Sequence, residues 1–319
     1  MQFVISRRDA LAGLGSALAL AGVPAARAAD LPLVRVSIVP IFTVAAQFAA
    51  DKQGYFAAEG IAVSTQPVQG GTVGIPGLVA GSFDVLYSNS ISVLTALERG
   101  IDLRIIAEAT PITDKPPDVG ALLKRKGENL KTGKDLEGKI IGINVKYDIQ
   151  WLVMQGWVKL TGGDLSKISY REVPLPSMVD ALKNKQVDAA LVLDPFMTIG
   201  LNDPAIEHMA WPLSAVMPGL PSSLWVVSGT LADTKADLVR AYVRGFMKGV
   251  AWVNANLGDD EYLQLVAGFT KTDVKLLAKM TTGGQPDHIN IDAMKRLVAL
   301  MREYDLLKTD VDFQSKIFK

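Results

Sequence analysis

The stretch "GSFDVLYSNS", residues 81–90, leads through an aspartate into apolar residues and ends in small polar ones. A similar stretch, "KQVDAALVLDPF", occupies residues 185–196. Each reads as a turn after a short helix, followed by an aspartate and a buried strand. The repetition predicts that the chain contains two structural units built on one plan.

Strands and helices are expected to alternate around both stretches. In the first half, apolar and β-branched runs at residues 33–40, 61–68 and 83–87 predict strands, and the segments between them predict helices that end at glycines. The same alternation restarts near residue 121. Because strands alternating with helices are typical of parallel βαβ units, the predicted fold class is α/β with mostly parallel sheets.

Two proline-rich segments, residues 113–120 and 200–222, predict irregular crossings between two lobes. Ligands of open α/β sheets bind beyond the carboxyl ends of the strands, where both quoted stretches end. Two lobes whose strand ends face each other form a cleft, and a double crossing between them forms a hinge.

The N-terminus reads as an export signal that is separate from the folded protein. Arg7 and Arg8 precede an apolar run from Ala10 to Val23, and Ala26-Arg27-Ala28 supplies the small residues of a cleavage site. This order is typical of a secretory signal peptide, and the run is too short to span a bilayer. We expect cleavage near Ala28. The arginine pair resembles the twin-arginine export motif; export of the unfolded chain and an amphipathic N-terminal helix are the alternatives.

Composition argues against several functional classes. The chain of 319 residues balances 33 basic against 33 acidic residues and has no cysteine. No basic face is evident, so a nucleic-acid partner is not expected, and the lack of cysteine excludes disulfides and thiolate catalysis. The two histidines, His208 and His288, have no partner at metal-ligand spacing. We therefore expect no metal, no cofactor and no catalytic residue.

Four phrases in order carry a resemblance to a known family: "ADKQGYFAAEGIAV", "LVAGSFDVLYSNS", "KDLEGKIIGINV" and "ALKNKQVDAALVLDPF". They resemble the solute-binding proteins of bacterial ABC importers, in the group that serves aliphatic sulfonates, taurine, nitrate and thiamine-precursor pyrimidines. The resemblance covers residues 33–270 approximately.

The resemblance implies a fold, a location and a partner. The fold is that of a type II periplasmic binding protein, with residues 30–115 and 222–319 in the first lobe, the latter including C-terminal helices, and residues 121–212 as the inserted second lobe. The implied protein is a periplasmic monomer that captures a small molecule and delivers it to a membrane permease. We do not expect it to be an enzyme.

Candidate ligand contacts lie at the expected strand ends of the first lobe. A phenylalanine offers a stacking face, a helix start offers free N–H groups for an acidic oxygen, and three short polar residues follow an apolar strand. Each also has an ordinary interpretation as core, helix cap or turn. These candidates are Phe42, Gly71, Thr72, Ser88, Asn89 and Ser90.

The candidates that follow are Lys146, Tyr147, Asp148, Asp194, Phe196 and Trp225. Asp148 is expected to cap the helix that follows it, which would occupy the N–H groups that an anion needs. Asp194 adds a second carboxylate, and no arginine stands at these strand ends to bind a sulfonate. Trp225 could stack on a ligand or lie in the core.

These features favour a planar heterocyclic or amine-bearing solute over a sulfonate. Two alternatives remain open at this point. One is an enzyme on the same fold that acts on a small heterocycle, for which Lys146, Tyr147 and Asp194 would have to converge. The other is an exported sensor that binds a ligand and contacts a receptor.

Overall fold

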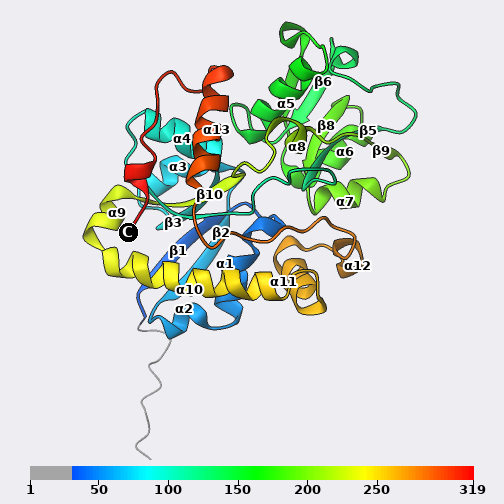
Figure 1. The fold of residues 1–319 in the computed structure, drawn as a ribbon. Coiled ribbons are helices and arrows are strands. Elements are labelled where there is room, and N and C mark those ends of the chain that lie inside the picture. Colours follow the sequence, from blue (N-terminus) through cyan, green and yellow to red (C-terminus); the bar gives the residue numbers. More distant parts are fainter. Residues whose placement is uncertain (1–30) are drawn as a thin grey trace, which may run out of the picture. The chain divides into compact units, whose positions relative to one another are not determined.

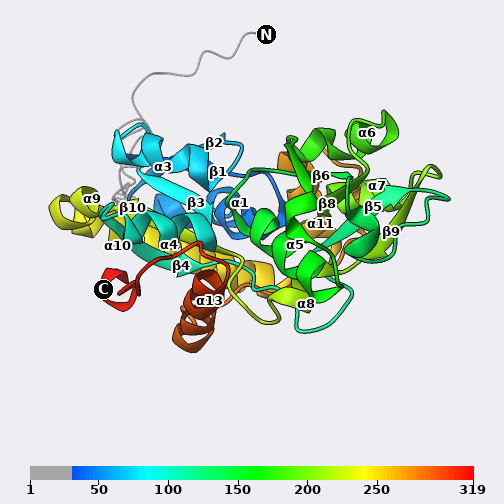
Figure 2. The ribbon, with the colours of Figure 1, turned by 90° about the horizontal axis from the view of Figure 1, so that it is seen from above.

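The computed structural model describes residues 31–319, and the expected export signal lies outside them. The described part contains two five-stranded sheets with helices packed around them (Figures 1 and 2). The first sheet has the order β2-β1-β3-β10-β4. Its strands are β1 (Leu33–Ile38), β2 (Ala62–Pro67), β3 (Val85–Asn89), β4 (Leu103–Glu108) and β10 (Ser223–Ser228).

The second sheet has the order β7-β6-β8-β5-β9. Its strands are β5 (Gly120–Arg125), β6 (Ile140–Ile143), β7 (Ser169–Glu172), β8 (Ala189–Leu193) and β9 (Ile206–Ala210). In each sheet the fourth strand in this order is antiparallel to both of its neighbours, and the other strands share one direction. The predicted α/β class with mostly parallel sheets is confirmed. We call each sheet with its helices a lobe.

The two similar stretches occupy equivalent places in the two lobes. Strand β3 lies in the middle of the first sheet and β8 in the middle of the second. All of β3 is buried, and β8 is buried except for its last residue. Apolar residues on both faces are expected of a strand that is covered by helices on either side. The repetition in the sequence is therefore a repetition of the central strand.

The aspartate before each central strand fastens it to a neighbouring strand. The N–H of Asp84 donates to the carbonyl of Arg35 at 2.8 Å, and Asp84 Oδ2 accepts from the N–H of Arg35 at 2.8 Å. Asp188 repeats this arrangement on Ile140: its N–H donates at 2.7 Å and its Oδ2 accepts at 2.9 Å. In both lobes one aspartate thus binds both backbone groups of a single residue.

We call the bonds of Asp84 to Arg35 and of Asp188 to Ile140 the aspartate clamps. An arginine side chain binds the aspartate of each clamp. The side chain of Arg35 donates to both oxygens of Asp84 at 2.9 Å, and Arg125 Nη2 lies 3.3 Å from Asp188 Oδ1. Burial raises the pKa of Asp84, but the bonds from the Arg35 side chain and backbone outweigh it, so the pKa lies below its usual value. The carboxylate stays ionised where it is needed as an acceptor.

The helices cover both faces of each sheet. Those of the first lobe are α1 (Ala45–Lys52), α2 (Tyr55–Ala58), α3 (Gly71–Val79), α4 (Ser90–Glu98), α9 (Gly229–Thr234), α10 (Ala236–Ala255), α11 (Asp260–Thr270), α12 (Val274–Leu277) and α13 (Ile291–Glu303). Those of the second lobe are α5 (Ile149–Leu160), α6 (Met178–Lys183), α7 (Phe196–Leu201) and α8 (Pro212–Val216). Helix α10, yellow in Figure 1, packs on α1 so closely that a Cβ at Gly249 would lie 2.3 Å from the Ala46 carbonyl oxygen.

The chain leaves the first sheet after β4 and returns to it as β10. The two crossing segments bind each other: Pro111 and Pro221 form an antiparallel bridge, and the N–H of Ile112 donates to the carbonyl of Leu220 at 3.0 Å. Asp118 adds a second link, because its Oδ2 accepts from the N–H of Ser214. Paired crossings of this kind can act as a hinge.

One expectation about the second crossing is wrong. Residues 200–222 were expected to be irregular, but they contain the edge strand β9 and helix α8. Strand β9 pairs with β5 through residues such as His208 and Glu207. An edge strand has one solvated side and tolerates such polar residues, so its sequence lacks the apolar run that marks a central strand. Among residues 31–319, no helix has both the length and the apolar character needed to cross a membrane.

The equivalence of the two clamps makes a testable prediction. Asp84→Ala and Asp188→Ala should each lower the free energy of unfolding by about 1–3 kcal/mol, because each leaves backbone and arginine donors without their acceptor. Urea unfolding measures the loss. Asp180→Ala, an exposed aspartate on α6, is the matched control and should change stability by less than about 0.5 kcal/mol. Losses no larger than the control's would show that the clamps do not hold the central strands.

Candidate functional site

A cleft lies where the carboxyl ends of the strands of the two lobes meet. It contains two small cavities of about 40 Å³ each, which we call the inner cavities, and one of about 300 Å³, the outer cavity. The inner cavities share a common set of lining residues from both lobes, namely Ile41, Tyr87, Ile149, Leu193 and Ser223. Asn144 and Leu175 line both the outer cavity and one inner cavity.

Of the three polar residues where β3 ends and α4 begins, Asn89 reaches the cleft. It lines an inner cavity and caps α4, where its Oδ1 accepts from the N–H of Ser92 at 2.9 Å. Ser88 and Ser90 are fully buried beside it and do not line the cavities. The Ser88 hydroxyl donates to the Asn89 carbonyl at 3.3 Å. The strand end therefore contributes one polar side chain and a helix start to the cleft.

Aromatic residues of the first lobe form one wall of an inner cavity. Phe42 lines it, as expected, and so does Tyr87, the residue before Ser88. The Tyr87 hydroxyl lies 2.6 Å from Thr43 Oγ1. Burial raises the pKa of Tyr87, against the bonds to Ser223 and Thr43. Tyr87 was not singled out in the sequence, although its position at a strand end was the available signal.

The start of α3 also lies at the cleft. The helix begins at Gly71, and Gly70 before it lines an inner cavity. A Cβ at Gly70 would lie 3.3 Å from Val145 Cγ2 and 3.4 Å from Asn144 Nδ2, so the lobes approach each other closely here. The side chain of the candidate Thr72 lies outside the described part of the chain, and so does the exposure of the candidate Gly71.

Asp148 lies in the cleft and caps α5, as the sequence predicted. Its Oδ1 accepts from the N–H groups of Gln150 at 2.9 Å and Trp151 at 3.4 Å. The side chain is buried and lines an inner cavity. Burial raises the pKa of Asp148 to about 7, against the two backbone bonds. The folded protein therefore holds this proton more tightly than an exposed aspartate would.

Asp194 directly follows β8, much as Asn89 ends β3, and it lines the other inner cavity. Its Oδ1 accepts from the N–H and hydroxyl of Thr198 in α7 at 3.0 and 2.7 Å. Its Oδ2 accepts from the N–H of Thr281 at 3.3 Å. Burial raises the pKa of Asp194 to about 6. Both oxygens are bound by the protein itself, which leaves this carboxylate little capacity for a ligand.

The structure places the remaining candidates differently. Phe196 is half-buried and lines the outer cavity. Lys146 and Tyr147 are exposed and line none of the three cavities, because Tyr147 has a φ of 62° in the turn before α5 and its ring packs on Trp151. Trp225 is completely buried in the first-lobe core, between Tyr87 and Phe246. Lys146, Tyr147 and Trp225 therefore do not reach the cleft.

Two residues of the second lobe that were not singled out in the sequence line the cleft, and one of them bonds to the first lobe. Asn144 follows β6, and its Nδ2 donates to the carbonyl of Gln69 in the first lobe at 2.8 Å. Gln150 lies in the first turn of α5, and its Oε1 accepts from the N–H of Asn144 at 2.6 Å. A polar residue at the end of the strand before Lys146 was the signal for Asn144. Nothing in the sequence pointed to Gln150.

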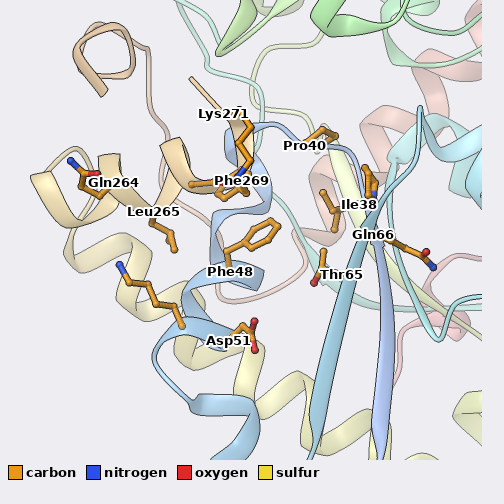
Figure 3. Close-up of a pocket in the computed structure, with 13 residues that line it drawn as sticks. Ile38, Pro40, Phe48, Asp51, Thr65, Gln66, Gln264, Leu265, Phe269 and Lys271 are labelled. Atoms are coloured by element: carbon orange, nitrogen blue, oxygen red, sulfur yellow. Dashed lines mark hydrogen bonds between the residues drawn. The ribbon is translucent and has the colours of Figure 1, made fainter. Parts of the chain in front are cut away.

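A larger groove of about 640 Å³ adjoins the outer cavity at Pro40 and Pro67 but is lined by residues of the first lobe alone (Figure 3). It lies between α1, α11 and the ends of β1 and β2, and the rings of Phe48 and Phe269 stack in its wall at 4.2 Å. Its charged residues Asp51, Lys52 and Lys271 are exposed. Because it draws on one lobe and its aromatic faces are already paired, we place the functional site in the cleft. Among residues 31–319, no group of three or more metal-ligating side chains is close enough to hold an ion.

Comparisons with solved structures show which proteins share this fold. The periplasmic aliphatic sulphonate binding protein SsuA from Escherichia coli is 15% identical, with a TM-score of 0.71, over 90% of this chain and 97% of its own. The alkanesulfonate-binding protein SsuA from Xanthomonas axonopodis pv. citri, bound to MOPS, is 17% identical with a TM-score of 0.74. The match covers 89% of this chain and 97% of that protein. The nitrate-binding protein NrtA from Synechocystis PCC 6803 is 13% identical with a TM-score of 0.73. The match covers 90% of this chain and 85% of that protein.

At these identities the likeness shows the fold, which is that of the type II periplasmic binding proteins. No curated protein sequence matches the chain. The family described as NMT1/THI5 like matches residues 41–256, which is more than half of the chain. The chain therefore belongs to the NMT1/THI5-like family.

Proposed function

We propose that this protein is the solute-binding component of an ABC importer, which captures a small organic molecule between its lobes and delivers it to a membrane permease. The observation that carries the proposal is a cleft whose buried polar groups come from both lobes, joined by the bond from Asn144 to Gln69. A site shared between two lobes that are linked by a double crossing couples binding to closure. The periplasmic binding proteins that share the fold support the same role.

The proposal includes export and a monomeric state. Residues 1–28 are the export signal, of the twin-arginine type and removed near Ala28, and the mature protein acts in the periplasm. The first lobe comprises residues 30–115 and 222–319, and the second comprises residues 121–212. The strand membership of the two sheets supports this division.

The solute that we favour is a planar heterocycle or an amine-bearing molecule over a sulfonate. Among the described residues that line the three cleft cavities there is no lysine, arginine or histidine. Asp148 takes the N–H groups at the start of α5 that an anion would otherwise use. When ionised, Asp148 also repels an anion, and burial in the cleft strengthens that repulsion.

We propose binding without turnover. The alternative of an enzyme on the same fold needs Lys146, Tyr147 and Asp194 to converge. Lys146 and Tyr147 are exposed outside the cavities, and both oxygens of Asp194 are bound by Thr198 and Thr281. The three residues that the enzyme alternative needs therefore do not converge on a bound solute.

A panel of solutes tests the proposed function. One arm contains sulfonates, nitrate and dicarboxylates, and the other contains aminopyrimidines, flavin-like rings and aromatic amines. A cognate solute at a thousand times its dissociation constant should add about 4 kcal/mol to the free energy of unfolding, a rise of several degrees in Tm. Small-angle scattering should show a more compact protein with the same solute. Stabilisation by the anion arm alone would contradict the preference for a heterocycle or amine.

The charge of the cleft predicts a pH dependence of stability. The pKa of Asp148 rises from about 4 in the unfolded chain to about 7 in the folded protein. The folded state therefore holds this proton more tightly, and the destabilising effect of ionisation grows as the pH rises from 4 and is complete above 7. Between pH 5 and pH 8, Asp148 should remove about 2–3 kcal/mol of stability.

Urea unfolding of the natural protein and of Asp148→Asn at both pH values isolates this effect. Asparagine keeps an oxygen for the N–H of Gln150 and cannot ionise. The natural protein should lose more stability than the variant between pH 5 and pH 8, by the amount above. Equal losses in the two proteins would mean that Asp148 is already ionised at pH 5.

A further inference from the structure

Two polar atoms in the cleft have no hydrogen-bond partner within the described chain: Gln150 Nε2 and Asn144 Oδ1. The two side chains are 1% and 6% exposed, and both line the same inner cavity. A buried amide group without a partner is costly, and native proteins rarely leave one unless a ligand or water satisfies it. One of the two atoms is a donor and the other is an acceptor.

The orientation of both amides is set by bonds to the backbone. Gln150 Oε1 accepts from the N–H of Asn144 at 2.6 Å, so its Nε2 is the end left free. Asn144 Nδ2 donates to the Gln69 carbonyl at 2.8 Å, so its Oδ1 is the end left free. Rotating either amide by half a turn would place like groups against each other. The cleft therefore presents a fixed donor and a fixed acceptor on neighbouring side chains.

Gln150 Nε2 and Asn144 Oδ1 together distinguish solutes by whether their polar group offers a donor, an acceptor or both. A sulfonate or carboxylate has only acceptors, and Asn144 Oδ1 would face it without a hydrogen. An ammonium group has only donors, and Gln150 Nε2 would face it without a lone pair. A carboxamide or lactam carries one N–H and one C=O side by side, so it satisfies both atoms at once. Neither end carries a charge, which suits cavities lined by no cationic side chain.

The sizes of the cavities divide the ligand into two parts. An inner cavity of about 40 Å³ accepts a group of a few atoms. The outer cavity of about 300 Å³ joins it at Asn144 and is lined mainly by apolar residues, including Val68, Leu175 and Phe196. A small polar head and a larger apolar body match this arrangement.

We propose that Asn144 and Gln150 recognise the paired N–H and C=O of an uncharged carboxamide or lactam, whose apolar remainder occupies the outer cavity. This assignment rests on the proposed function, because it concerns the solute of the same cleft. It narrows the solute to a neutral amide-bearing molecule and excludes both sulfonates and simple amines.

Four probes with one ring and different heads test the assignment: benzamide, benzoate, benzenesulfonate and benzylamine, each at the same millimolar concentration. Benzamide should raise Tm by about 2 °C or more, and the other three should raise it less. Because the probes differ only in the head, the comparison does not depend on any substitution folding correctly.

Gln150→Glu then removes the free donor while keeping an oxygen for the N–H of Asn144. It should weaken benzamide binding by about tenfold or more, measured by calorimetry. Gln155→Glu is the matched control: Gln155 lies on the same helix and donates to the Tyr170 hydroxyl at 2.9 Å, outside the three cavities. The control should change benzamide affinity by less than about twofold.

A larger Tm rise with benzoate, benzenesulfonate or benzylamine than with benzamide would overturn the assignment, and so would no response to any probe. Equal benzamide affinity in Gln150→Glu and Gln155→Glu would also overturn it, since water alone would then satisfy the pair. The proposed function fails separately, if no solute of the wider panel stabilises the protein or closes it in scattering. A solute without an amide that closes the lobes would contradict this assignment and leave the proposed function intact.

Discussion

Each lobe depends on one aspartate that binds both backbone groups of a residue in the adjacent strand. Asp84 does this on Arg35 and Asp188 on Ile140. The contact determines the register of the central strand, and a slip of one residue would turn every apolar side chain to the opposite face. With the register determined, each central strand ends at the cleft, where Asn89 and Asp194 each accept an N–H group from the first turn of the next helix. The position of the cleft thus follows from two carboxylates at the far ends of these strands.

Hydrogen bonds from the backbone to aspartates also explain why the cleft is not strongly charged. Asp148 and Asp194 lie among its lining residues, yet each already accepts backbone N–H groups. Asp148 accepts those of Gln150 and Trp151, and Asp194 accepts those of Thr198 and Thr281. Burial raises the pKa of both groups, so the cleft carries less negative charge than two exposed aspartates would give it. What remains free for a solute is neutral hydrogen-bonding capacity, provided chiefly by Asn144 and Gln150. Specificity in such a site depends on matching donors and acceptors more than on net charge.

The repeat, the α/β class and the cap at Asp148 could be predicted from the sequence, because each depends on local pattern and spacing. Strand β9 could not, since an edge strand with a histidine and a glutamate does not show the pattern of a buried one. Trp225 and Tyr147 show a second limit: adjacency to a strand end does not say which face a side chain occupies, and one lies in the core while the other is exposed. Gln150 depends on a bond to the backbone of Asn144, which exists only once strand β6 and helix α5 are folded together.

We propose that solute binding closes the two lobes on each other, and the lack of cysteine in the chain allows a direct test. Val79→Cys on α3 and Leu160→Cys on α5 place dyes at exposed positions, one in each lobe. When a solute that raises Tm is titrated in, energy transfer between the dyes should change and then level off. The solute concentration at half of this change should equal the dissociation constant of the solute. Adding Gly70→Val, which would crowd Val145 and Asn144 where the lobes meet, should reduce that change. A solute that binds and stabilises the protein with no change in energy transfer would show that binding does not close the lobes.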